Sequence, residues 1–327
     1  MMSDRHGMKY YLVAGPLFTS IFLSFIGVLP DFYLIILFIG NLGIAAYHPA
    51  SAAIAGHYGG RRKGLSSSLI NFGGNLGSAF GSLIIILILE KAGIEYTPLI
   101  LIPGIITSLV LLKYAPKNNI ISSPGKSFNI VSRLKKINRI RLSMIFIILF
   151  IIYTMYIIWI TVVSYMPLYF TNKNISLINI GNILLLFGGL GGAAGLLSGY
   201  LYDHYKKGYL IIQTGLIISI PLFFFTFKTE DMLSITLFII GGFFLISVQP
   251  VCIRMAQDLL PGNMSLASSL ILGLSPGLAG ITMIFLGKAA DIIGIASLIR
   301  YELLGLAFSL LILFIFPMLE KRLKRIN

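Results

Sequence analysis

The sequence predicts an all-α integral membrane protein, a bundle of about ten transmembrane helices in two pseudo-repeats, with four helices in the first and six in the second. Three observations predict it. Hydrophobic residues make up 57% of the chain and charged residues 11%, whereas soluble domains carry about 25% charged residues. Apolar runs approach the roughly 20 residues that a membrane-spanning helix needs. The chain also resembles itself at a fixed spacing.

Ten apolar runs define the predicted helices. In chain order they cover 10–28, 32–56, 65–89, 97–114, 142–170, 178–202, 209–227, 233–253, 264–287 and about 298–318. The runs are continuous and lack period-two alternation, which favours helices over the strands of a membrane barrel. The longest connection, 113–141, is too short for a folded domain.

The internal repeat divides the chain. A shift of 201 residues pairs Gly40 with Gly241, His48-Pro49 with Gln249-Pro250, and Ser67–Ile70 with Ser268–Ile271; a shift of 199 pairs Asp4 with Asp203. We therefore predict a truncated N-terminal half at 1–112, a cytoplasmic linker at 113–141 and a C-terminal half at 142–327. The first half has no counterpart of the helices 142–170 and 178–202, which predicts a twelve-helix ancestor; either the first two helices were lost, or the start codon is assigned too late.

The positive charge is distributed unevenly. If the helices alternate in direction, 20 of the 25 Lys and Arg residues fall on one face of the membrane and 5 on the other. Cytoplasmic loops carry such an excess of Lys and Arg. The pattern predicts a multi-pass protein of the cell membrane with both termini cytoplasmic. It also explains the net charge of +14 by topology and contact with the lipid bilayer, with no nucleic-acid partner.

Two helices carry a polar stripe opposite a glycine stripe. In helix 65–89 the polar stripe includes Asn71, Asn75 and Ser78, and the glycines are Gly73, Gly77 and Gly81. In helix 264–287 the polar stripe includes Ser268 and Ser275, and Gly277 lies opposite. Glycine lets a neighbouring helix approach closely, and polar side chains face a wet cavity or another polar helix. We predict a substrate or proton pathway along the polar stripes; helix–helix contact on both faces is the alternative.

His48 is an ionisable group inside an apolar helix, with Asn41 seven residues earlier on the same face. Such a group is a functional hypothesis, and histidine can change its charge near neutral pH. We predict that Asn41, His48 and Gln249, the counterpart of His48, belong to the pathway. The alternative is a neutral His48 that bonds a carbonyl freed by Pro49.

Charged and small residues at the helix ends have simpler roles. Helix 178–202 carries Gly195 and Gly199 on one narrow face that ends at Asp203, which predicts a packing surface. Arg254 and Asp258, four residues apart, predict a local ion pair. Asp291, Arg300 and Glu302 are predicted to be interfacial anchors.

Enzyme signatures are absent from the sequence. The 4 His residues lack metal-ligand spacing, and neither a Gly-x-x-x-x-Gly-Lys-Ser/Thr loop nor a Gly-x-Ser-x-Gly motif occurs. The single Cys252 allows no intrachain disulfide. We therefore expect no enzyme activity, no metal and no cofactor.

Two groups of motifs resemble a known family. The segments around Asp4 and Asp203 resemble the Gly-x-x-x-Asp-Arg-x-Gly-Arg-Lys loop of the major facilitator superfamily. The segments His48-Pro49, Gly73–Gly81 and Gln257–Gly262 resemble its fosmidomycin-resistance efflux family, and the whole chain would correspond to that family's third to twelfth helices. The sequence departs from these patterns at Met8, Ala50, Ser82 and Lys206.

The resemblance implies a major-facilitator-type bundle and secondary active transport. It implies export of a small organic compound or drug by alternating access, coupled to protons as an antiporter, by a protein that works as a monomer. It also implies that Asp4 and Asp203 form a conformational latch. The alternatives are an uptake carrier for a small metabolite and a truncated remnant that transports nothing.

Overall fold

The computed structural model describes residues 8–60, 63–116, 137–260 and 264–326. Within these ranges every regular element is helical and no strand occurs, which confirms the all-α prediction. Nine of the described helices are long and apolar enough to cross a membrane. Helix α2 (Met8–Ser24), which covers the first predicted span 10–28, has 17 residues and is not one of these nine.

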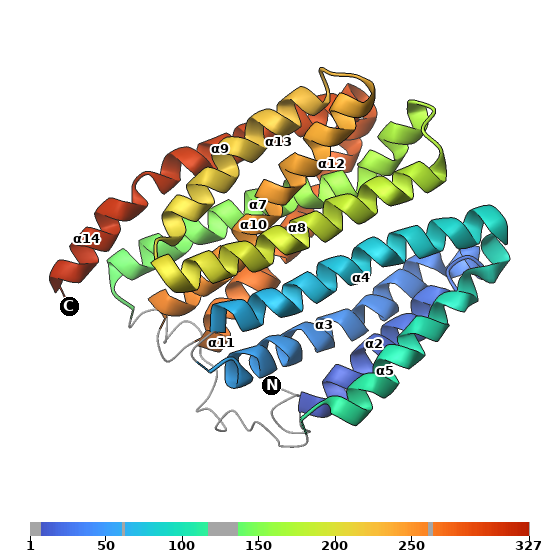
Figure 1. The fold of residues 1–327 in the computed structure, drawn as a ribbon, viewed down its shortest axis with the longest axis horizontal. Helices are drawn as coiled ribbons and strands as arrows, with labels where there is room; N and C mark the ends of the chain where they lie inside the picture. The colour runs from blue at the N-terminus through green and yellow to red at the C-terminus, as the bar shows by residue number, and fades with distance from the viewer. Residues whose placement is uncertain (1–7, 61–62, 117–136, 261–263, 327) are drawn as a thin grey trace. The chain divides into compact units, whose positions relative to one another are not determined.

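The chain divides by packing into two compact units (Figure 1). One unit contains residues 1–66 and 81–128, and the other contains 67–80 and 129–327. The boundary therefore crosses helix α4, whose middle segment clusters with the second unit. The two halves predicted from the internal repeat, 1–112 and 142–327, describe how the chain evolved and not how it packs, and they stay a prediction.

The first unit is built on helix α2. Its remaining elements are η1 (Pro30–Phe32), α3 (Tyr33–Tyr58), the ends of α4 (Lys63–Lys91), η2 (Ile94–Ile100) and α5 (Leu101–Tyr114). Helix α2 packs against both α3 and α5. A Cβ at Gly15 of α2 would lie 2.8 Å from the Gly43 carbonyl oxygen of α3, so these two backbones approach as only small residues allow. Thr19 Oγ1 donates to the Gly40 carbonyl at 2.9 Å across the same contact.

The second unit contains the remaining helices. They are α7 (Arg139–Asn172), α8 (Leu177–Tyr205), α9 (Gly208–Thr226), α10 (Asp231–Leu259), α11 (Met264–Ser269), η3 (Leu270–Leu274), α12 (Ser275–Ile293), α13 (Ile295–Leu313) and α14 (Phe316–Ile326). Helix α10 packs against α8 and α9, and α7 packs against α12 and α13.

Helix α7 is the central helix of the second unit. In its most hydrophobic window 61% of the residues are buried, against 6% in the corresponding window of α4. Four phenylalanines of this core are in contact: Phe238 stacks on Phe187 at 4.7 Å between ring centroids and meets Phe170 and Phe223 edge-on at 5.7 and 6.1 Å. Such aromatic pairs contribute beyond the area they bury.

Two predicted helices are interrupted. The run 264–287 begins as α11, passes through the π-helical turn η3 and continues as α12. Pro276 stands in the first turn of α12, and a proline has no N–H to donate to the preceding turn, which is where the regular pattern breaks. The run 298–318 ends as α13 at Leu313, and an amphipathic helix, α14, follows.

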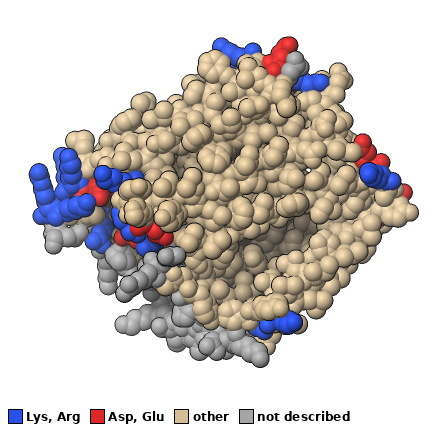
Figure 2. Space-filling model, viewed as in Figure 1, with Lys and Arg blue, Asp and Glu red and all other residues tan. Residues whose placement is uncertain are grey.

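Charged side chains are restricted in position. On the face drawn in Figure 2, Lys, Arg, Asp and Glu gather in separate groups, and the broad surface between them is uncharged. Burying a charge in hydrocarbon is costly, so this uncharged surface suits a helix bundle that spans a bilayer.

Gly242→Ala is expected to destabilise the second unit by about 1–3 kcal/mol, the usual effect of overpacking a core. A Cβ at this position would overlap the ring of Phe187, which is 2% exposed. Gly277→Ala is the matched control, because its Cβ would meet no described atom within 4 Å.

The measurement is thermal unfolding in detergent, followed with a maleimide fluorophore. Cys252 is the only cysteine of the sequence and is 0% exposed, so its labelling reports unfolding. Equal melting temperatures for the two variants would contradict the packing described for Gly242.

Candidate functional site

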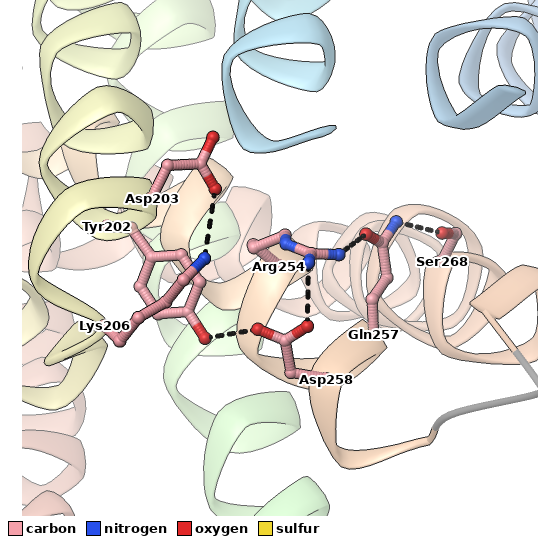
Figure 3. A network of polar contacts seen from close by, with 7 residues as sticks. All are labelled: Tyr202, Asp203, Lys206, Arg254, Gln257, Asp258 and Ser268. Atoms are coloured by element: carbon pink, nitrogen blue, oxygen red, sulfur yellow. Dashed lines mark hydrogen bonds and ion pairs between the residues drawn. The ribbon is translucent and has the colours of Figure 1, made fainter. Parts of the chain in front are cut away.

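Polar side chains of the second unit gather where α8 and α10 end (Figure 3). We call Tyr202, Arg254, Gln257, Asp258 and Ser268 the end network. The Tyr202 hydroxyl donates to Asp258 Oδ2 at 2.7 Å, and Arg254 Nη2 lies 2.9 Å from Asp258 Oδ1. Arg254 Nη1 donates to Gln257 Oε1 at 3.3 Å, and Gln257 Nε2 donates to Ser268 Oγ at 2.9 Å. The network thus joins α8, α10 and α11 in one chain of contacts.

The sequence positions this network through helical spacing. Arg254 and Asp258 are four residues apart on α10, so they share a face, and the predicted ion pair is confirmed. The Arg254 side chain is 14% exposed and that of Asp258 38%. A cavity of about 200 Å³, lined in part by Tyr202, Asp258, Glu320 and Lys324, adjoins the network.

Asp203 lies beside the end network at the last turn of α8. Lys206 Nζ is 3.5 Å from Asp203 Oδ1, and the ammonium group also lies over the Tyr202 ring, 5.3 Å from its centroid. Lys206 ends the helix with a positive φ of 55°, a conformation that glycine adopts more readily. The other predicted latch residue, Asp4, lies outside the described residues. The latch stays a prediction.

Helix α7 carries a second polar group, which we call the α7 polar row: Tyr153, Tyr156 and Thr161. Each bonds a different helix. Tyr153 bonds Thr282 Oγ1 of α12 at 2.8 Å, Tyr156 accepts from Gln249 Nε2 of α10 at 2.6 Å, and Thr161 donates to Glu302 Oε1 of α13 at 2.7 Å. Polar contacts of this kind join helices where no water is available.

Gln249, Ser268 and Ser275, all predicted pathway residues, lie in the second unit and have polar partners. Gln249 bonds Tyr156, as above, and Ser268 belongs to the end network. Ser275 is 2% exposed and donates to the Leu270 carbonyl at 3.5 Å, across the π-helical turn. The structure therefore brings Gln249 to the α7 polar row and Ser268 to the end network.

The predicted polar stripe of α4 partly faces α8. A Cβ on Gly192 of α8 would lie 3.3 Å from the Asn75 Cβ, and one on Gly188 would lie 2.9 Å from the Ala79 Cβ. Asn71 is partly buried, whereas Ser78 is exposed.

The predicted packing glycines fall into two groups. Gly195 packs against Pro250: a Cβ on Gly195 would lie 3.4 Å from the proline Cγ. Gly199 is buried. At Gly73, Gly77, Gly81 and Gly277 a Cβ would meet no atom of the described residues within 4 Å. A packing role for these four stays a prediction without a described partner helix.

Asn41 and His48 lie in the first unit, and both are exposed. The Asn41 amide donates to the Leu37 carbonyl of its own helix at 2.8 Å. The His48 ring lies edge-on to Tyr47 at 6.0 Å between centroids. Their role in a pathway stays a prediction.

Glu302 corrects one expectation. The sequence predicts an interfacial anchor at this position, but Glu302 Oε1 accepts from Thr161, and its Oε2 is buried without a partner among the described residues. The signal was available in the sequence: Glu302 stands three residues after Ile299 and four before Leu306, on the apolar face of α13.

The described residues offer no candidate metal site. Among the described residues no group of three or more His, Cys, Asp and Glu side chains is arranged to hold a metal ion.

Comparison with known proteins identifies the family. Residues 1–271 match the Major Facilitator Superfamily. The chain is 26% identical to the fosmidomycin resistance protein of Escherichia coli (strain K12), over 88% of this chain and 72% of that protein. It is also 26% identical to the uncharacterized MFS-type transporter YfnC of Bacillus subtilis (strain 168), over 90% of this chain and 73% of that protein.

Solved structures show the same fold. The Escherichia coli fucose:proton symporter FucP aligns with a TM-score of 0.65 at 15% identity, over 95% of this chain and 84% of that chain. A double Trp mutant of XylE aligns with a TM-score of 0.67 at 15% identity, over 95% and 80%. With its helical fold, its apolar spans and a family match that covers most of its length, the chain is a membrane transporter of the Major Facilitator Superfamily.

Proposed function

We propose that the chain is a secondary active transporter of the cell membrane that exports a small organic compound in exchange for protons, by alternating access. The observation that carries the proposal is the similarity to the fosmidomycin resistance protein, which extends over 88% of this chain. A polar, fosmidomycin-like compound is accordingly the first candidate substrate. In this proposal the protein works as a monomer with both termini in the cytoplasm, as the distribution of its Lys and Arg residues favours.

The substrate pathway in this proposal uses the polar stripes. Its residues are Asn41, His48, Asn71, Asn75, Ser78, Gln249, Ser268 and Ser275. Support comes from the second unit, where Gln249 bonds Tyr156 at 2.6 Å and Gln257 bonds Ser268 at 2.9 Å. Polar groups inside spanning helices are costly, so their presence favours a function over a purely structural role.

The end network is proposed to hold one conformation of the carrier. Tyr202, Arg254 and Asp258 tie α8 to α10 at the helix ends, and Asp203 with Lys206 lies next to them (Figure 3). Charged hydrogen bonds of this kind can be exchanged between two arrangements when helices shift, which is what a conformational latch requires.

Export in exchange for protons predicts the sign of a proton flux. Fosmidomycin added outside everted vesicles that contain the chain should enter and drive protons out, so the lumen becomes alkaline. A pH-sensitive dye in the lumen measures this change, and vesicles without the chain are the control. Acidification would show proton symport, the uptake mechanism, and contradict the proposed exchange. An unchanged lumen would contradict proton-coupled transport of fosmidomycin.

Tyr202→Phe should weaken the end network. The substitution removes the hydroxyl that donates to Asp258 at 2.7 Å, at a position that is 5% exposed. A hydrogen bond to a charged group contributes about 1.5–3 kcal/mol, so we expect a lower melting temperature and a changed rate of transport. Tyr200→Phe is the matched control, because Tyr200 lies on the same helix and is 56% exposed. Equal melting temperatures and equal transport rates of the two variants would show that the end network has no role in the mechanism.

A further inference from the structure

Glu302 is a partly buried acidic side chain of the second unit, and its Oε2 atom is fully buried. It stands seven residues after Ile295, the first residue of α13, which places it about 10 Å along the helix. Thr161 of α7 contacts its carboxyl group, and Met283 of α12 contacts Thr161 in turn. Thr161 is 0% exposed, and the α13 neighbours Ile299 and Leu306 are also 0% exposed.

The carboxyl group has no positive partner. Among the described residues no Lys, Arg or His nitrogen forms a salt bridge with it. Arg300, two residues away, is exposed and donates to the Ala296 carbonyl and to Ser297 Oγ. On α12, Lys288 and Asp291 are exposed, and α9 contains no charged residue. On α7 the titratable groups nearest along the helix are the hydroxyls of Tyr156 and Tyr165.

The hydrogen bonds at Thr161 favour a protonated Glu302 carboxyl group. Thr161 Oγ1 has one hydrogen but lies close to two acceptors, Glu302 Oε1 at 2.7 Å and Met283 Sδ at 3.4 Å. If Glu302 is ionised, Thr161 must donate to Oε1, the sulfur is left without a hydrogen, and the charged Oε2 is buried without a partner. If Glu302 carries a proton on Oε1, it donates to Thr161, and Thr161 donates to Met283. Only a neutral carbonyl oxygen then lacks a partner, which costs much less than a charge.

We propose that Glu302, Thr161 and Met283 form a proton-binding site, in which the Glu302 carboxyl is the group that binds and releases the transported proton. Release is Glu302–COOH plus water giving the carboxylate and a hydronium ion. It requires a conformation in which water reaches the hydrogen on Oε1 and accepts it; Thr161 then turns its own hydrogen toward Oε1, and water solvates Oε2. The role in transport rests on the proposed function, whereas the protonated carboxyl is a property of the protein alone.

Infrared difference spectroscopy of the purified protein in lipid nanodiscs, each variant against the wild type, tests the site without any substrate. At neutral pH the wild type should show the carbonyl band of a protonated carboxyl, and Glu302→Gln should lose it. Thr161→Val keeps the shape of the side chain but removes the hydroxyl, so the band should move to higher frequency. Glu320→Gln is the matched control, because Glu320 forms an ion pair with Lys324 at 2.9 Å and should not change the band.

A spectrum that Glu302→Gln leaves unchanged overturns the proposal. Labelling of Cys252 checks that each variant is folded. If Glu302→Gln does not fold, the shift in Thr161→Val decides, and an unshifted band in that variant overturns the proposal.

The transport arm uses fosmidomycin and everted vesicles. Glu302→Gln should lose the change in lumenal pH but keep exchange of labelled for unlabelled fosmidomycin, because exchange needs no net proton movement. If His48→Gln removes the pH change and Glu302→Gln keeps it, the proton is bound at His48 and the proposal fails. If wild-type vesicles move no protons with fosmidomycin, the proposed function fails, and the infrared band alone decides whether Glu302 holds a proton.

Discussion

Polar groups inside a bilayer find no water, so their partners must come from the protein. The second unit shows how this constraint is met. The α7 polar row bonds α10, α12 and α13 in turn, each with one side-chain contact between 2.6 and 2.8 Å. These contacts hold α7 at the centre of the unit, where 61% of its most hydrophobic window is buried. Glu302 meets the constraint only in part, because its buried Oε2 has no partner among the described residues, which is why its protonation state matters.

Glycine has two different roles in this chain. At Gly15 and Gly43 it allows α2 and α3 to approach so closely that a Cβ would collide with the facing backbone, and at Gly242 it leaves room for the ring of Phe187. At Gly73, Gly77 and Gly81 the glycine side of α4 meets no described atom within 4 Å. A stripe of small residues therefore shows that a close approach is possible, and the structure shows which stripes are used within the described residues.

The two polar groups of the second unit differ in exposure and in chemistry. The end network contains a charge pair that is partly open to solvent, with Asp258 38% exposed, and it ties helix ends together. The α7 polar row lies among apolar side chains, and its one acidic partner, Glu302, has no cation beside it in the described residues. Exposed pairs can be exchanged when helices move, whereas a buried acid gains or loses a proton. In the proposed transport cycle, the two groups would therefore act in different steps.

The sequence by itself determined the all-α membrane class, the approximate bounds of the helices and the pair Arg254–Asp258. These features depend on hydrophobicity and on spacing along one helix, which a sequence shows directly. Only the tertiary structure decided that Tyr156 meets Gln249, that Thr161 meets Glu302, and that the α4 glycines have no described neighbour. Such contacts join residues 93 or 141 positions apart. They depend on how helices rotate and pack against each other, and the periodicity of a single helix does not contain that information.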